Sequence, residues 1–344
     1  MGYTNMLDSF GGVIEDDLKK QLKHAVKDGS EYHPFIADVY EALEEFVLRG
    51  GKRLGSCSTL IVYKGYKDQI NDEVVKACTG IELYRHSILI HDDIVDAELF
   101  RRCGKTLHRL LEERYDGRFG VGSSIFCGNM LYSYAIKAVL ESGFDNSKLM
   151  EVVNLLSSDY KDVNESQILD LLFEYKEPSV DEWETMVDKR ASSLFRTSML
   201  TGAILASAPE KDRVILEDTA KHIGYAFDIQ DDIIDTFASK EQYGREPGGD
   251  ILKRKKPLHI ILAMKKDRHI ASVMKSNDKL TAEDIASIME FIRASGALDE
   301  AKSISREHGE EAKKLISLTD MNSEAKEFFI SFIDYVEDSL DWYK

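Results

Sequence analysis

Apolar residues recur along most of this chain at spacings of three and four, which is the period of an amphipathic α-helix. Alternating apolar and polar runs bounded by turn dipeptides, which would indicate strands, are missing from the sequence. The five prolines all fall between segments with helical periodicity. The pattern therefore predicts an all-α fold, with helices at residues 5–28, 33–48, 52–66, 72–98, 121–141, 146–174, 180–207, 211–237, 255–265, 281–294, 297–316 and 322–341. No composition shift or flexible linker divides these segments, so we expect one domain over residues 1–344.

Two of the expected helices carry a stripe that passes from apolar to acidic residues. The stripes run through Val74, Cys78, Ile81, Arg85, Ile88, Asp92 and Asp96, and through Ala220, Ile223, Phe227, Asp231 and Asp235. If the two helices pack side by side, they enclose an apolar chamber with an acidic rim. Such a chamber suits an amphipathic ligand with a charged head and a hydrocarbon tail.

The acidic ends of both stripes repeat the pattern Asp-Asp-Ile-x-Asp, at residues 92–96 and 231–235. Positions i and i+4 share one helix face, so the first and last carboxylates of each run project together. Like charges at this spacing destabilise a helix by about 0.2–0.5 kcal/mol per pair, a penalty that a bound divalent cation removes. One such run would be read as a solvated helix face, but two runs among apolar neighbours indicate Mg²⁺ and diphosphate chemistry.

The charge balance limits the partners of this chain. A formal net charge of -17 argues against nucleic acid, which needs a basic surface. The four cysteines are scattered without the spacing of a zinc site. The first residues lack the apolar core of a signal peptide, and no apolar run approaches the length of a membrane helix, so we expect a cytoplasmic protein.

An anionic substrate must then be held by local cations. Four groups of basic residues are candidates for holding the substrate. They are Lys52-Arg53 after two glycines, Arg101-Arg102 one loop after the first acidic run, Lys189-Arg190, and the basic run at 253–256 after the second acidic run. Arginine is the side chain best suited to bidentate contacts with phosphate.

In this order, the motifs from Gly50 to Pro257 resemble those of the trans-isoprenyl diphosphate synthases, also called polyprenyl synthetases, and most resemble a geranylgeranyl diphosphate synthase. The resemblance rests on Gly50-Gly51-Lys52-Arg53, the acidic run at 92–96, Arg101-Arg102 with Thr106 and His108, Gln167 and Asp170, Lys189, Phe227, the acidic run at 231–235, and Lys255. It implies antiparallel helices around a deep apolar cavity, and a homodimer. It also implies that an allylic diphosphate ionises, isopentenyl diphosphate attacks the carbocation, and a proton is lost.

The resemblance also assigns roles to individual residues. A cluster of about three Mg²⁺ ions is expected, with Asp92, Asp96 and Asp231 as direct ligands. Asp93, Asp232 and Asp235 support them. The allylic diphosphate falls to Arg101, Lys189, Arg245 and Lys255, with Asp228 beside them. Isopentenyl diphosphate is expected to be bound by Lys52, Arg53, Arg85 and Arg102. The rest of the cavity is expected to be lined by Gln167, Asp170 and Phe227.

This chain departs from the family pattern beside the isopentenyl diphosphate residues. The family usually has another Arg where this chain has Gly55, and His or Gln where it has Arg85. We hypothesise that the guanidinium of Arg85 replaces the one missing at position 55.

Two more departures lie beside the second acidic run. The usual Lys-Thr is Lys189-Arg190 here, and the usual Phe-Gln is Phe227-Asp228. Asp228 could be an extra metal ligand or an acid paired with Arg190, and the sequence leaves both open.

Product length is governed in this family by bulky residues below the first aspartate motif. Ser87 and Ile88 are not aromatic, and Tyr84 lies eight residues before Asp92, about 12 Å along a helix. Tyr84 would therefore stop chain growth farther from the metal site than an aromatic residue at 87 or 88 would. This favours a C20 product, geranylgeranyl diphosphate, with C15 and C25 as alternatives.

Three rival functions stay open. A class I terpene cyclase shares the first acidic motif but normally lacks a second one of this type. A non-catalytic regulatory subunit of a prenyl synthase usually loses one motif, whereas this chain keeps both. An acidic helical scaffold would need neither.

Overall fold

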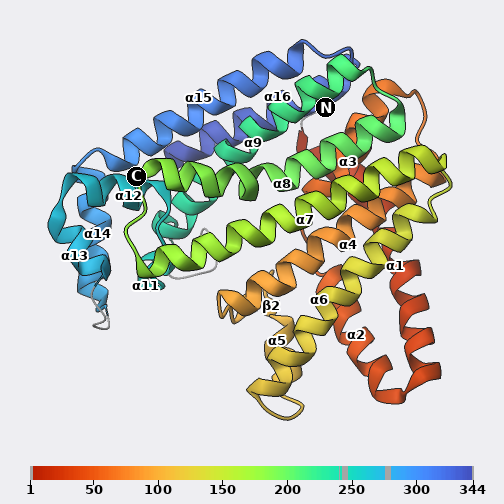
Figure 1. Cartoon of the computed structure of the whole chain (residues 1–344), viewed down its shortest axis with the longest axis horizontal. Coiled ribbons are helices and arrows are strands. Elements are labelled where there is room, and N and C mark those ends of the chain that lie inside the picture. Colours follow the sequence, from red (N-terminus) through yellow and green to blue (C-terminus); the bar gives the residue numbers. More distant parts are fainter. Residues whose placement is uncertain (1–2, 240, 242–246, 276–279, 343–344) are drawn as a thin grey trace. The chain divides into compact units, whose positions relative to one another are not determined.

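The computed structural model describes residues 3–239, 241, 247–275 and 280–342 (Figure 1). In these residues the secondary structure is helical, apart from one antiparallel pair of two-residue strands, β1 (Phe100–Arg101) and β2 (Gly104–Lys105). The all-α prediction is therefore confirmed. The chain groups into two compact units: the first is Met1–Leu156, Thr197–Ala208 and Met321–Ala325, and the second is Ser157–Arg196, Pro209–Asp320 and Lys326–Lys344. The single domain expected over 1–344 stays a prediction.

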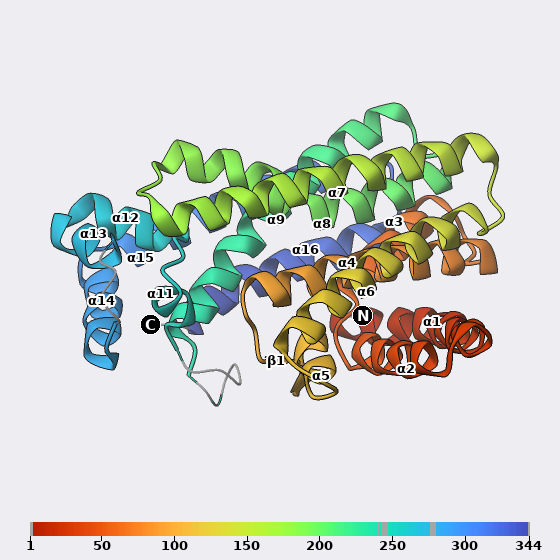
Figure 2. The same ribbon diagram turned by 60° about the horizontal axis from the view of Figure 1, so that its bottom comes forward.

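The first unit is built around one buried helix. It contains α1 (Tyr3–Tyr32), α2 (Pro34–Leu48), α3 (Leu54–Tyr66), α4 (Asp72–Val95), α5 (Leu107–Glu112) and α6 (Gly117–Leu140). In Figures 1 and 2, α1 lies beside α2 and α4 lies beside α6. The side chain of Asn71 caps α4 by accepting a hydrogen bond from the Val74 amide at 3.0 Å. α4 is buried along most of its length, which explains why its sequence is apolar on several faces. The first aspartate motif lies at its C-terminal end.

The second unit carries the second aspartate motif. It contains the later part of α7 (Asn146–Tyr175), the earlier part of α8 (Val180–Ala206), α9 (Glu210–Phe237), α11 (Gly249–Leu252), α12 (Leu258–Lys266), α13 (Arg268–Lys275), α14 (Ala282–Ala294), α15 (Ala297–Ser317), most of α16 (Ser323–Ser339) and a 3₁₀ turn, Leu340–Trp342. α9 lies against α15, where the Ser305 hydroxyl donates to the Ala226 carbonyl at 3.0 Å. Trp183, Ile229 and Ile261 are among the buried residues of its core. The second motif occupies the last two turns of α9.

Left-handed residues account for two boundaries that differ from the prediction. The helix predicted to 98 ends at Val95, because Ala97 adopts a left-handed backbone with φ of 51°. The helix predicted from 52 begins at Leu54, because Arg53 has φ of 46°. Neither residue is a glycine, so sequence alone did not indicate the break.

The short elements were missed. α5, α11, α13 and the β1–β2 hairpin are too short for a periodic pattern to identify. The helix predicted from 121 begins at Gly117, and the one predicted from 255 begins at Leu258 after Pro257. Among the described residues, no helix combines the length and apolar character that crossing a membrane requires.

Candidate active site

The first aspartate motif is bound to the hairpin that follows it. Asp93 is 1% exposed, and its Oδ1 accepts a hydrogen bond from Arg101 Nε at 2.7 Å. Arg101 Nη2 also lies 3.2 Å from Asp92 Oδ2. The helix continues through one more turn, since the Asp96 amide donates to the Asp92 carbonyl at 2.9 Å. The spacing of four therefore keeps both acids at the same helix end, with Arg101 beside them.

Asp93 has an acceptor that the protein does not satisfy. Its Oδ2 is buried and has no hydrogen-bond partner among the described residues. Burial raises the pKa of Asp93 to about 6, although the adjacent Arg101 opposes the shift. The first motif thus keeps one buried carboxylate oxygen without a hydrogen bond from the described residues.

The second aspartate motif has the same feature at the same position. Asp232 Oδ2 is buried without a hydrogen bond in the described structure, and burial together with the charge of Asp228 raises the pKa of Asp232 well above its usual value. Asp235 faces the start of α11, where its Oδ2 accepts a hydrogen bond from the Asp250 amide at 2.9 Å. Burial, and then the charge of Asp235, raises the pKa of Asp250 to about 8. Asp231 is exposed at the helix end.

These carboxylates suit a hard divalent cation. Carboxylate oxygens are ligands that Mg²⁺ prefers, and bound metal would stabilise their ionised forms. No three His, Cys, Asp or Glu side chains of the described residues converge into a cation site on their own. Mg²⁺ commonly takes one or two carboxylates and completes its shell with water and substrate phosphate.

Arg190 decides the question that the sequence left open at Asp228. Arg190 Nε and Nη2 donate to the two carboxylate oxygens of Asp228 at 3.1 and 2.7 Å. Its Nη1 lies 3.4 Å from Asp170 Oδ1, and the same Nη2 lies 3.8 Å from Asp232 Oδ2. Desolvation lowers the pKa of Arg190, but the charges of the three acids outweigh it and raise the pKa overall. Asp228 is therefore the partner of Arg190 in this structure.

The other predicted residues of the second unit lie around this cluster. Lys255 Nζ lies 3.7 Å from Asp170. Lys189 points toward α7 and not toward the Arg190 cluster. There its Nζ lies 3.0 Å from Asp162 Oδ1 and also contacts Glu165. The ring of Phe227 lies 5.8 Å from that of Phe195. Gln167 is half-buried one turn before Asp170, and Arg245 lies outside the described residues.

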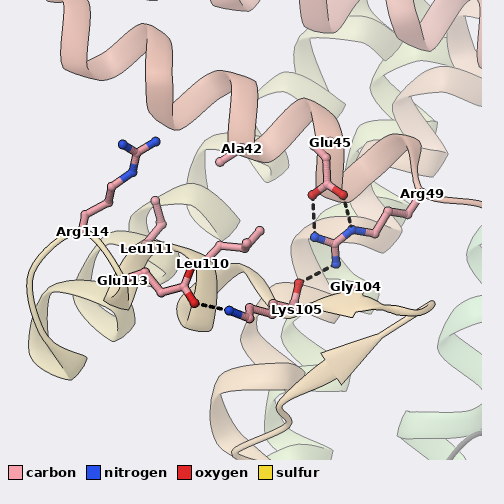
Figure 3. A pocket seen from close by; sticks show the side chains of 9 residues that line it. All are labelled: Ala42, Glu45, Arg49, Gly104, Lys105, Leu110, Leu111, Glu113 and Arg114. Atoms are coloured by element: carbon pink, nitrogen blue, oxygen red, sulfur yellow. Dashed lines mark hydrogen bonds and ion pairs between the residues drawn. The ribbon is translucent and has the colours of Figure 1, made fainter.

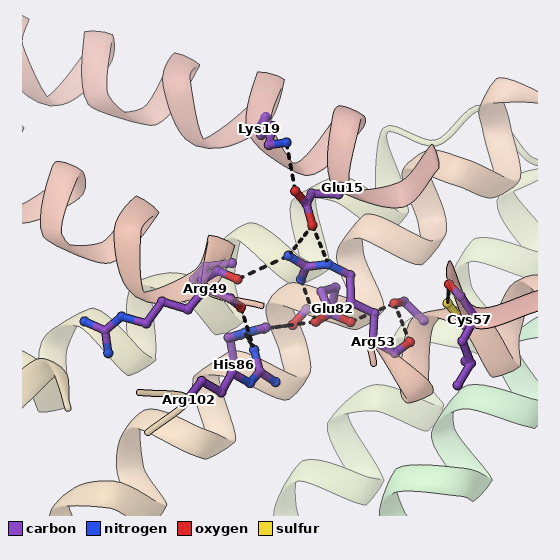
Figure 4. A network of polar contacts seen from close by, with 11 residues as sticks. Glu15, Lys19, Arg49, Arg53, Cys57, Glu82, His86 and Arg102 are labelled. Atoms are coloured by element: carbon purple, nitrogen blue, oxygen red, sulfur yellow. Dashed lines mark hydrogen bonds and ion pairs between the residues drawn. The ribbon is translucent and has the colours of Figure 1, made fainter. Parts of the chain in front are cut away.

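The role expected of Arg53 needs correction. Its guanidinium is buried between Glu15 and Glu82, with contacts of 3.1 and 3.0 Å, as Figure 4 shows. The left-handed backbone at Arg53 turns the side chain inward, so it organises the loop instead of facing a substrate. Lys52 is exposed, with Nζ 6.0 Å from the centre of the Tyr3 ring.

Sequence reasoning missed Glu82 and His86, which lie on α4 below the first motif. Glu82 accepts hydrogen bonds from Arg53 and from the Ser56 hydroxyl. Desolvation raises the pKa of Glu82, but nearby cations and the Ser56 hydroxyl lower it further than that, so the buried carboxylate is ionised. An acid within an apolar helix was the signal used to find Asp92. The same signal marks Glu82.

The residues expected to set product length are all inside the first unit. Tyr84, Ser87 and Ile88 are 3%, 0% and 8% exposed. The Ser87 hydroxyl donates to the Tyr84 carbonyl at 2.7 Å, and the ring of Tyr84 lies 6.3 Å from that of Tyr132 on α6. A larger side chain at position 87 would therefore have to displace its neighbours.

Comparison with known proteins identifies the family. The family model described as polyprenyl synthetase matches residues 37–292. A short chain isoprenyl diphosphate synthase of Methanocaldococcus jannaschii is 31% identical over 83% of this chain and 85% of its own, and a geranylgeranyl pyrophosphate synthase of Geoglobus acetivorans is 28% identical over 94% and 95%. The structure of a geranylgeranyl pyrophosphate synthase from Corynebacterium glutamicum, complexed with isoprenyl diphosphate and magnesium, superposes with a TM-score of 0.89 at 25% identity, covering 97% of this chain and 99% of that one. This chain therefore belongs to the polyprenyl synthetase family and is an isoprenyl diphosphate synthase, a prenyltransferase with the isoprenoid synthase fold.

Proposed function

We propose that this trans-prenyltransferase condenses isopentenyl diphosphate with allylic diphosphates up to geranylgeranyl diphosphate, using Mg²⁺ held by the two aspartate motifs. The observation that carries the proposal is that one buried carboxylate oxygen on Asp93 and one on Asp232, at equivalent places in the two motifs, have no hydrogen bond within the described residues. Mg²⁺ at these residues would neutralise the departing diphosphate.

The residues of the chain supply the other parts of the reaction. Arg101, which Asp92 and Asp93 hold at the first motif, would contact the allylic diphosphate. Lys52 and Arg102 are exposed cations suited to the diphosphate of isopentenyl diphosphate. Exclusion of water from the reacting carbons would keep the carbocation from being quenched. The released diphosphate would accept the proton.

Incubation of the purified protein with Mg²⁺, labelled isopentenyl diphosphate and each allylic primer tests this function. We expect a C20 diphosphate, and we expect EDTA to abolish its formation until Mg²⁺ is restored. Release of a cyclic hydrocarbon from the primer alone would indicate a terpene cyclase. A folded protein without turnover would favour a regulatory subunit.

Replacing Ser87 with Phe should shorten the product to C15. Ser87 is fully buried beside the backbone of Tyr84, so the new ring would displace its neighbours and take up room that the growing chain needs below the first motif. Product chromatography measures the effect. Ser87→Ala is the matched control because it removes the hydroxyl without adding bulk. An unchanged product from a folded Ser87→Phe enzyme would show that position 87 does not limit growth.

Replacing Arg85 with His should raise the KM for isopentenyl diphosphate, if Arg85 supplies the charge missing at Gly55. Desolvation lowers the pKa of Arg102, whereas the charge of Glu82 raises it. The charge of Arg85 is one of several nearby positive charges that also lower the pKa of Arg102. Steady-state kinetics with varied isopentenyl diphosphate measures the effect, and an unchanged KM would disprove the replacement.

We also propose a homodimer that pairs through α6. This helix exposes Val121, Ile125 and Phe126, the last of them 68% exposed, and burial of such a surface would be favourable. Sedimentation velocity should show a dimer that Phe126→Asp converts to a monomer. Leu318→Asp, at another exposed apolar side chain, is the control and should leave the dimer intact.

A further inference from the structure

The hairpin that carries Arg101 and Arg102 is not stabilised by its own sequence. Its strands pair Phe100 with Lys105 and Arg101 with Gly104, which leaves Arg102 and Cys103 as a two-residue turn. Both turn residues are left-handed, with φ of 52° and 61°. A turn of this kind favours Asn-Gly, and a ladder of two pairs is marginal alone. The surroundings must therefore hold the hairpin in this conformation.

Arg49, at the end of α2, holds the backbone of the hairpin. Its Nη1 donates to the Arg101 carbonyl at 3.4 Å. Nη1 also donates to the Lys105 carbonyl, and Nε donates to Glu45 at 2.7 Å (Figure 3). The guanidinium lies across Gly104, where a Cβ atom would come within 2.4 Å of Arg49 Cζ. Arg49 and Lys105 also line a pocket of about 620 Å³. The hairpin is thus fastened to α2 by one side chain.

His86, on α4, holds the side chain of Arg102. Arg102 Nη1 donates to His86 Nε2 at 3.2 Å and to the Arg49 carbonyl at 3.3 Å, as Figure 4 shows. On the opposite side of the imidazole, Nδ1 donates to the Glu82 carbonyl at 2.9 Å. Burial lowers the pKa of His86 to about 4, so the ring is neutral and its Nε2 lone pair faces Arg102. The tautomer is assigned from these partners.

These contacts leave one edge of Arg102 available. A guanidinium has five N–H donors, and the two on Nη1 are used by His86 and Arg49. Among the described residues, Nε and Nη2 of Arg102 have no hydrogen-bond partner, and the residue is exposed. The Nε–Nη2 edge is the one that binds an oxyanion through two parallel bonds. Gly51 allows this placement, because a Cβ atom there would come within 2.7 Å of Arg102 Cζ.

We propose that Arg49 and His86 are positioning residues, which orient the Nε–Nη2 edge of Arg102 toward the diphosphate of isopentenyl diphosphate. Arg49 sets the backbone of the hairpin, and His86 sets the guanidinium. The inference rests on the proposed function, in which Arg102 binds that substrate.

Kinetics on His86→Leu, His86→Gln and Gly51→Ala test the role of His86. His86→Leu should raise the KM for isopentenyl diphosphate about tenfold, because a hydrogen bond to a charged group is lost, with a smaller change in kcat and in the KM for the allylic primer. His86→Gln retains a neutral acceptor and should restore most of the loss. Gly51→Ala removes no polar group and displaces only the end of Arg102, so it should reproduce the increase even if His86→Leu fails to fold.

Hydrogen exchange on Arg49→Met tests the hairpin separately, with Arg102→Met as the reference. We expect faster exchange of the amides of residues 100–105 and a raised KM for isopentenyl diphosphate. Unchanged exchange in Arg49→Met would overturn the positioning role. So would an unchanged KM for isopentenyl diphosphate in Gly51→Ala and in both His86 variants, provided that Arg102→Met raises this KM. An unchanged KM in Arg102→Met itself shows instead that the substrate assignment of the proposed function is wrong, whatever the exchange measures.

Discussion

Asp92→Asn should lower the rate of prenyl transfer by about 10²–10³-fold, the effect of removing one group that stabilises developing charge. The amide preserves the shape of the side chain and can still accept a hydrogen bond from Arg101, which lies 3.2 Å away. It lacks the negative charge that a divalent cation requires. The free energy of unfolding should therefore change little while catalysis falls.

The measurement is kcat/KM across a series of Mg²⁺ concentrations. The Asn variant should need more Mg²⁺ for its residual activity, because a charged ligand has been lost. Glu73→Gln is the matched control: it removes an acid from the first turn of the same helix, at the end opposite the motif. If Asp92→Asn retained the full rate with an unchanged Mg²⁺ dependence, Asp92 would not be a metal ligand.

The second large effect is expected at Arg190. Arg190→Thr leaves Asp170, Asp228 and Asp232 without their shared cation. Breaking a fully buried ion pair costs 3–5 kcal/mol, and the side chains of Arg190 and Asp228 keep 20% and 16% exposure, so we expect a loss of about 2–3 kcal/mol. Urea unfolding without metal measures it.

A double variant separates charge from packing. Arg190→Thr with Asp228→Gln installs the pair that the family usually carries and removes both partners, so it should recover most of the lost stability. Mg²⁺ should stabilise the single Arg190→Thr variant more than the parent, because uncompensated carboxylates bind the cation more strongly. A single variant as stable as the parent would show that Arg190 does not balance these acids.

The residues of the first unit show where sequence reasoning succeeded and where it stopped. The stripe on α4 indicated a buried helix with acids at one end, and the helix is buried along most of its length with Asp92 and Asp93 in its last turn. The same reasoning placed Arg53 beside a substrate, yet its guanidinium is enclosed by Glu15 and Glu82. Its inward direction follows from a left-handed backbone at a residue type that seldom adopts one.

The sequence alone determined the helical architecture, the placement of both aspartate motifs on helices and the family to which they point. Periodicity and i, i+4 spacing are local properties, so they can be read without knowing what a helix packs against. Only the tertiary structure decided which charges are paired. Arg53 meets Glu15, and Arg190 meets Asp228, in each case across 38 residues of sequence. Such partners are set by packing between helices, and burial then determines whether a cation faces a carboxylate of the protein or is left for a substrate.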